Sequence, residues 1–132
     1  MDPCTTLLEK LNRHPELVHY KFLGGVRIEP CGSNGFAVEL FGDDEKWTVH
    51  CGTGGFHETF NSAEEALNFV AWCYSGTARL REMWRGNSPE KSVLEGCDDG
   101  EWRQVSVTGF FFVPFWRKRR EIILQNPNLL KD

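Results

Sequence analysis

Apolar and polar residues alternate along most of this chain, and two stretches instead repeat their apolar residues every three or four positions. Alternation is typical of strands with one buried face, and the longer period is typical of amphipathic helices. We therefore predict one helix near residues 5–13 and a second that begins after Ser62. Glu65 follows Ser62 by three residues and completes a capping box, and Gly76 is placed to end this helix.

The alternating stretches predict strands with turn residues between them. Gly24 and Gly25 interrupt the first strand, where we expect a bulge. The predicted strands cover residues 20–29, 36–41, 47–51, 56–60, 78–85, 92–95, 102–107 and 110–115, with a last apolar segment at 121–125. A helix followed by four strands thus occurs twice, with one extra strand at the end.

The chain also repeats part of its own sequence. Residues 38–60 align without a gap on residues 93–115, and eight positions match, mostly turn residues and large apolar residues. Such residues persist when one supersecondary unit is used twice. The fold class predicted is α+β, with an antiparallel β-sheet built from two similar helix-plus-meander units (α-β4-α-β4 and a C-terminal strand) and two helices packed on the sheet. Chance similarity between two hairpins is the alternative.

The repeat predicts a register for the hairpin of residues 47–60. With Thr53-Gly54 as a two-residue turn, Trp47 faces Phe60, and His50 faces His57 on the opposite side of the sheet. The same offset predicts two pairs in the second copy: Trp102 with Phe115, and Val105 with Phe112.

Composition favours one globular domain over residues 1–132. Hydrophobic residues make up 40% and charged residues 26%, which is ordinary for a folded protein. The five cysteines are far apart and odd in number, which argues against a disulfide framework and a zinc knuckle. No apolar run approaches the 18 or so residues of a membrane span, so we expect a cytoplasmic protein that does not enter a membrane.

Charge is unevenly distributed along the chain. The net charge is −4, but residues 1–77 carry −6 and residues 78–132 carry +2. An acidic protein is a poor candidate for a dedicated nucleic-acid binder, and the basic second half matters for the choice of partner.

The differences between the two copies suggest the first candidate site. His50 and His57 occupy positions where the second copy has Val105 and Phe112. Imidazoles at opposed strand positions can share a metal ion, but a third ligand cannot be placed from the sequence. A solvated cross-strand pair is the simpler interpretation.

The second candidate site is the segment 109–120, where aromatic residues run into four consecutive basic residues. It could bind a protein or an anionic ligand, or it could be a core strand followed by a solvated turn. The residues predicted at this interface are Phe110, Phe112, Trp116, Arg117, Lys118, Arg119 and Arg120.

Catalytic motifs do not occur in the sequence, and the paired residues Asp43-Asp44 and Asp98-Asp99 suit tight turns. We therefore predict a non-enzymatic cytoplasmic binding or protein-interaction module without a cofactor. Its partner is expected to be another protein or a second copy in a homodimer, with a small ligand as a further option. The alternatives are a metal-binding protein or small enzyme that uses His50 and His57, and contact with an anionic ligand or nucleic acid through residues 117–120.

Overall fold

The computed structural model describes residues 2–43, 45–53, 56–109 and 117–130. It contains two helices in this part of the chain, α1 (Pro3–Leu11) and α2 (Ala63–Cys73). The Asp2 carboxylate caps α1 by accepting from the Cys4 amide at 3.0 Å, and the Ser62 hydroxyl caps α2 by accepting from the Glu65 amide at 3.3 Å. Both predicted helices are confirmed. Each begins after a side chain that accepts a hydrogen bond from a first-turn amide, which has no acceptor within the helix.

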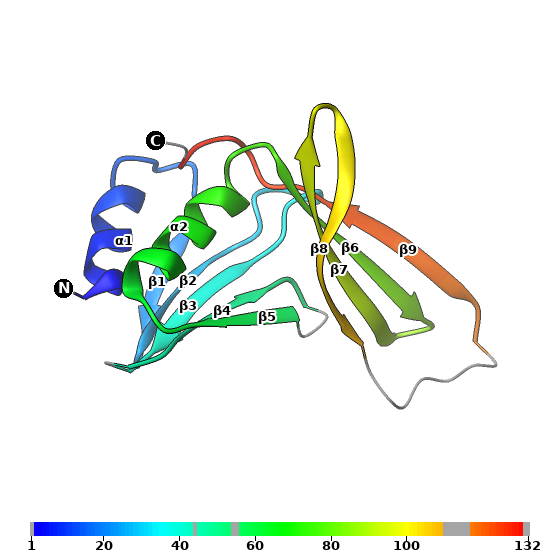
Figure 1. Cartoon of the computed structure of the whole chain (residues 1–132), viewed down its shortest axis with the longest axis horizontal. Helices are drawn as coiled ribbons and strands as arrows, with labels where there is room; N and C mark the ends of the chain where they lie inside the picture. Colours follow the sequence, from blue (N-terminus) through cyan, green and yellow to red (C-terminus); the bar gives the residue numbers. More distant parts are fainter. Residues whose placement is uncertain (1, 44, 54–55, 110–116, 131–132) are drawn as a thin grey trace.

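Five strands form the first sheet as a simple antiparallel meander in chain order. Both helices cover one face of this sheet, and the other face is left without a helix (Figure 1). The strands are β1 (His19–Phe22), β2 (Gly25–Ile28), β3 (Val38–Gly42), β4 (Trp47–Cys51) and β5 (Phe56–Phe60).

The prediction of one bulged strand over residues 20–29 is wrong, because this stretch is the β1–β2 hairpin. Phe22 pairs with Gly25, so Leu23 and Gly24 form the turn. Gly24 has a φ of +84°, which a glycine adopts without strain. Gly25 also has to remain a glycine, since an added Cβ would lie 2.5 Å from the Leu40 carbonyl oxygen on β3.

A separate four-stranded antiparallel sheet follows α2. Its order is β8-β7-β6-β9, so the last strand returns to pair with β6 at the opposite edge from β8. The strands are β6 (Ala78–Arg85), β7 (Ser88–Asp98), β8 (Glu101–Gly109) and β9 (Arg119–Leu124). Strand β7 is longer than the predicted 92–95 and carries a register shift between Leu94 and Glu95 against β8.

The sequence repeat corresponds to two hairpins, β3–β4 and β7–β8. Gly42 pairs with Trp47 in the first, and Cys97 pairs with Trp102, at the same offset, in the second. The duplicated helix-plus-meander arrangement is not confirmed, because the two hairpins belong to separate sheets of different strand order. The architecture is α+β with two antiparallel sheets and two helices. The predicted strand 110–115 lies outside the described residues.

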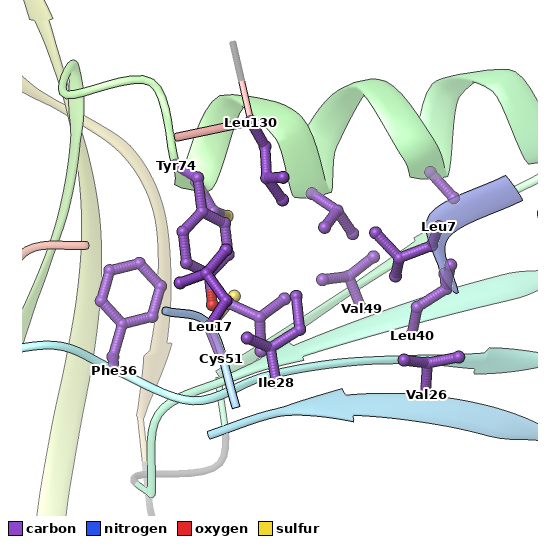
Figure 2. Packing of buried hydrophobic residues seen from close by; sticks show 14 of the residues in the cluster. Leu7, Leu17, Val26, Ile28, Phe36, Leu40, Val49, Cys51, Tyr74 and Leu130 are labelled. Carbon is purple, nitrogen blue, oxygen red and sulfur yellow. The ribbon is translucent and has the colours of Figure 1, made fainter. Parts of the chain in front are cut away.

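The main hydrophobic core lies between the helices and the first sheet. Figure 2 shows Leu7, Val26, Leu40 and Val49 packed between these layers, and all four are almost completely buried. The same cluster of buried residues continues through Tyr74 to Leu80 and Leu94 of the second sheet. One hydrophobic cluster therefore joins the two sheets.

Three of the buried core residues are cysteines, and one of them is Cys4 on α1. Cys51 on β4 and Cys73 at the end of α2 are fully buried, and all five cysteines are free thiols. A hydrogen bond to Cys73, together with burial, raises the pKa of Cys51. The buried Cys51 and Cys73 side chains pack as small apolar residues.

Polar contacts reinforce the junction between the sheets. The Glu82 carboxylate of β6 accepts from the Thr53 amide at 3.1 Å, and Ser106 of β8 donates to Glu58 of β5 at 2.6 Å. Residues 125–130 then cross back to the first sheet and the helices, with Leu130 in the core. Neither described helix is long and apolar enough to cross a membrane.

Candidate functional site

His50 and His57 face each other on β4 and β5, and the predicted register of this hairpin is confirmed at all five pairs. Val49 and Cys51 point into the core, so His50 between them lies on the face that no helix covers. The His50 Nδ1 atom is 3.7 Å from a carboxylate oxygen of Glu39 on the neighbouring strand.

Glu39 belongs to a charged row on this face. Its other carboxylate oxygen accepts from Arg27 Nη1 at 3.2 Å, and Arg27 Nε donates to Glu29 at 2.7 Å. The hydrogen bond to Glu29, followed by that to Glu39, raises the pKa of Arg27 despite its partial desolvation. No group of three or more metal-ligating side chains occurs among the described residues. Metal binding by His50 and His57 stays a prediction.

One aspartate of each pair, Asp43 and Asp99, takes part in a turn. Asp43 accepts from the amides of Glu45 and Lys46 at 2.9 and 3.0 Å, and these hydrogen bonds lower the pKa of its carboxyl group. Asp99 has a φ of +53° in the two-residue turn between β7 and β8. Both observations agree with the predicted turn chemistry.

The basic residues 117–120 are placed beside the β6–β7 hairpin. Arg119 starts β9 and pairs with Arg85 at the end of β6, while Arg120 pairs with Trp84. Two hydrogen bonds extend this contact beyond the strand: Arg85 donates to the Arg117 carbonyl and the Gly86 amide donates to the Lys118 carbonyl, each at 3.3 Å. All four basic side chains are exposed.

We call this part of the molecule the basic end, formed by residues 83–91 and 117–121. It lies at the tip of the second sheet, far from the helices (Figure 1). It carries two acidic residues, Glu90 and Glu121, and six basic residues: Arg85, Lys91, Arg117, Lys118, Arg119 and Arg120. With a net +4 here and −4 overall, the rest of the chain carries −8.

Four contacts hold three of the four arginines of the basic end. Glu90 lies between two of them, 2.9 Å from Arg119 Nε and 3.4 Å from Arg85 Nε. Arg119 also contacts the sulfur of Met83 at 3.7 Å. The guanidinium of Arg120 lies over the ring of Trp84, 5.5 Å from its centroid. These contacts restrain the Arg85, Arg119 and Arg120 side chains.

A second ionic network covers the face of the second sheet that points away from the core. Glu95 accepts from Arg79 at 2.6 Å and from Arg81 at 2.9 Å, and Arg81 also donates to Glu121 at 2.6 Å. Burial opposes ionisation of Glu95, but the two arginines hold its pKa below the ordinary value. We call this surface the outer face; it also carries Val93, Val107 and Ile123.

An open groove lies at the opposite end of the molecule, beside the β1–β2 hairpin and the start of both helices. Its volume is about 710 Å³, and Phe22 and Trp47 supply its large apolar side chains. Asp2, Lys21 and Asp43 place charges of both signs around it. None of the predicted site residues lines this groove.

The set of residues predicted for the interface was incomplete. Arg85 and Lys91 were missed. They lie at the facing ends of the predicted strands 78–85 and 92–95, so a hairpin between these strands would have placed them close together. The predicted interface residues Phe110, Phe112 and Trp116 lie outside the described residues. Of the predicted interface, the structure places only residues 117–120.

Comparison with known proteins adds no relative from which a role can be taken. No protein-family model, no curated protein and no solved structure matches this chain.

Proposed function

We propose that this protein is a non-enzymatic binding module that holds an anionic macromolecule on its basic end, and that it works in the cytoplasm. The observation that carries the proposal is the gathering of six basic side chains, from two segments some 30 residues apart, at one tip of an otherwise acidic molecule. Like charges this close repel one another. An anionic partner would therefore reduce an electrostatic repulsion that is present in the unbound protein.

The restrained conformation of the arginine side chains supports binding. Arg119 and Arg85 are held by Glu90, and Arg120 is held against Trp84. Long side chains lose rotamer freedom when they bind, and a side chain that is already restrained loses less. Arginine also donates in a fixed fork that suits carboxylate and phosphate groups.

The charge of this surface also bears on the predicted homodimer. In a twofold dimer the same patch meets itself, so the basic end of one copy would face the basic end of the other. Repulsion between two such surfaces disfavours this contact. A different, acidic molecule fits the basic end better than a second copy does.

Chromatography on immobilised heparin at pH 7 tests the proposal. The protein has a net charge of −4, so retention at low salt requires a local basic surface. We expect the wild type to be retained at about 20 mM salt, where the Debye length exceeds 20 Å, and to elute as salt rises.

Two double variants separate the basic end from overall charge. Arg117→Glu/Lys118→Glu reverses two exposed charges of the basic end, and we expect it to pass through the column. Lys46→Glu/Arg103→Glu changes the net charge by the same amount at exposed positions elsewhere, and we expect it to be retained. Failure of the wild type to bind at low salt, or loss of binding in both variants alike, refutes the proposal.

A further inference from the structure

We infer that the partner of the basic end is an acidic protein surface and not a nucleic acid; this inference rests on the proposed function. Three features of the surface carry it: the small number of basic side chains that have no ion pair, the use of Trp84 within the chain, and the aliphatic side chains beside the charges.

The number of available charges is small for a nucleic acid. In the part of the chain that the structure describes, Arg119 and Arg85 share Glu90, and no ion pair involves the other four basic residues of the basic end, Lys91, Arg117, Lys118 and Arg120. Proteins that bind DNA by charge commonly make about 6 to 10 phosphate contacts. A compact acidic patch on a protein can pair with these few charges at the tip of the molecule.

Among the described residues of the basic end, Trp84 carries the aromatic ring, and one face of this ring is already occupied. Binding of single strands uses exposed aromatic rings on which bases stack. One face of the Trp84 ring is covered by the guanidinium of Arg120, and the indole nitrogen of Trp84 is buried. Trp84 therefore orders Arg120 and leaves little surface for a base.

The outer face beside the basic end is partly aliphatic. One row across all four strands contains Val107, Val93, Arg81 and Ile123. Val107 is 44% exposed and Ile123 is 50% exposed, while Val93 between them is buried. The next row contains Lys91 of the basic end, two residues from Val93 along β7, which is roughly 7 Å away.

Exposed aliphatic side chains next to arginines match the make-up of protein interfaces, in which apolar contacts and charged pairs occur together. A phosphate backbone makes no use of Val107 or Ile123. The partner that fits both parts of this surface presents carboxylates together with apolar side chains.

Fluorescence anisotropy with two labelled probes of matched charge tests the inference. One probe is a 20-residue peptide with ten glutamates and five leucines, and the other is an 11-nucleotide single-stranded DNA with ten phosphates. At about 0.1 M salt, where exposed charges more than about 10 Å apart are screened, we expect the peptide to bind at least tenfold more tightly than the DNA.

Two double variants and a control double variant assign the contacts. Val107→Ser/Ile123→Ser should weaken peptide binding about tenfold and leave DNA binding unchanged, because it removes only aliphatic surface. Arg117→Glu/Lys118→Glu should weaken binding of both probes, and Lys46→Glu/Arg103→Glu should weaken neither by as much. Circular dichroism confirms that each variant is folded.

The outcomes separate the two proposals. If the DNA binds as tightly as the peptide, or if the serine variant binds the peptide as the wild type does, the inference of a protein partner is wrong and the basic end remains a binding surface. If neither probe binds the wild type, the proposed function itself fails.

Discussion

Replacement of Glu95 by glutamine should destabilise the protein at neutral pH by more than its position on the surface of a sheet would suggest. The Glu95 side chain is only 7% exposed, and it accepts short hydrogen bonds from Arg79 at 2.6 Å and Arg81 at 2.9 Å. A hydrogen bond to a charged group contributes about 1.5–3 kcal/mol. Glutamine keeps one oxygen acceptor, and the two arginines are partly solvated, so we expect a loss of about 1.5–3 kcal/mol in the free energy of unfolding.

The effect should depend on pH in a definite direction. The folded state holds the pKa of Glu95 below its ordinary value, so its contribution is fully present above the unfolded pKa of about 4.3. As pH falls from there through the lower folded pKa, the unfolded chain takes up the proton first and the contribution is lost. The difference between wild type and Glu95→Gln should therefore shrink as the pH is lowered.

Urea unfolding, followed by tryptophan fluorescence at several pH values, measures this difference. Glu121→Gln is the matched control, because Glu121 also pairs with Arg81 but its side chain is 44% exposed. We expect a loss of about 0.5 kcal/mol for this control, as for other exposed ion pairs. Equal stability of Glu95→Gln and wild type at pH 7, or a difference that is constant down to about pH 3, would refute the reasoning.

Three further changes test the fold. Leu80→Ala should cost about 2–5 kcal/mol in urea unfolding, because it opens a cavity where the second sheet joins the core; a loss below about 1 kcal/mol would contradict a shared core. Gly24→Ala should cost about 1–2 kcal/mol and Gly24→Asn less, since the φ of +84° strains a side chain although the space is open; equal effects would argue against this turn. Glu82→Leu should destabilise by about 1–3 kcal/mol and increase hydrogen exchange at the Thr53 amide, because this amide loses a partly buried hydrogen bond to a carboxylate; unchanged exchange would remove the proposed contact.

The elements that could be predicted from the sequence depend on neighbouring residues. The Ser62–Glu65 cap and the facing of Trp47 and Phe60 follow from spacing within one helix turn or one hairpin, and both are found. The β1–β2 hairpin was missed because two adjacent glycines suit a bulge as well as a turn, and the choice depends on how closely Gly25 approaches Leu40 of β3.

Long-range pairing could not be predicted. Strand β9 pairs with β6, about 40 residues earlier in the chain, and an alternating pattern does not say which sheet edge a strand will join. The basic end depends on this pairing, because it brings residues 117–120 to Arg85 and Glu90. The basic tetrad was visible in the sequence, but its surroundings were not.

The course of the C-terminal segment has a mechanical consequence for the basic end. Residues 117–120 lie at the start of β9, which pairs with β6 at six positions, and the chain beyond it is attached by the Leu129 amide to the Tyr74 carbonyl and by Leu130 in the core. A partner that pulls on the basic end along the direction of β9 would load all six pairs at the same time, in shear. A pull perpendicular to β9 would instead break the pairs one after another. Force on a bound partner would thus pass along β9 and the C-terminal segment to the hydrophobic core of the first sheet. Both sheets would resist that force together.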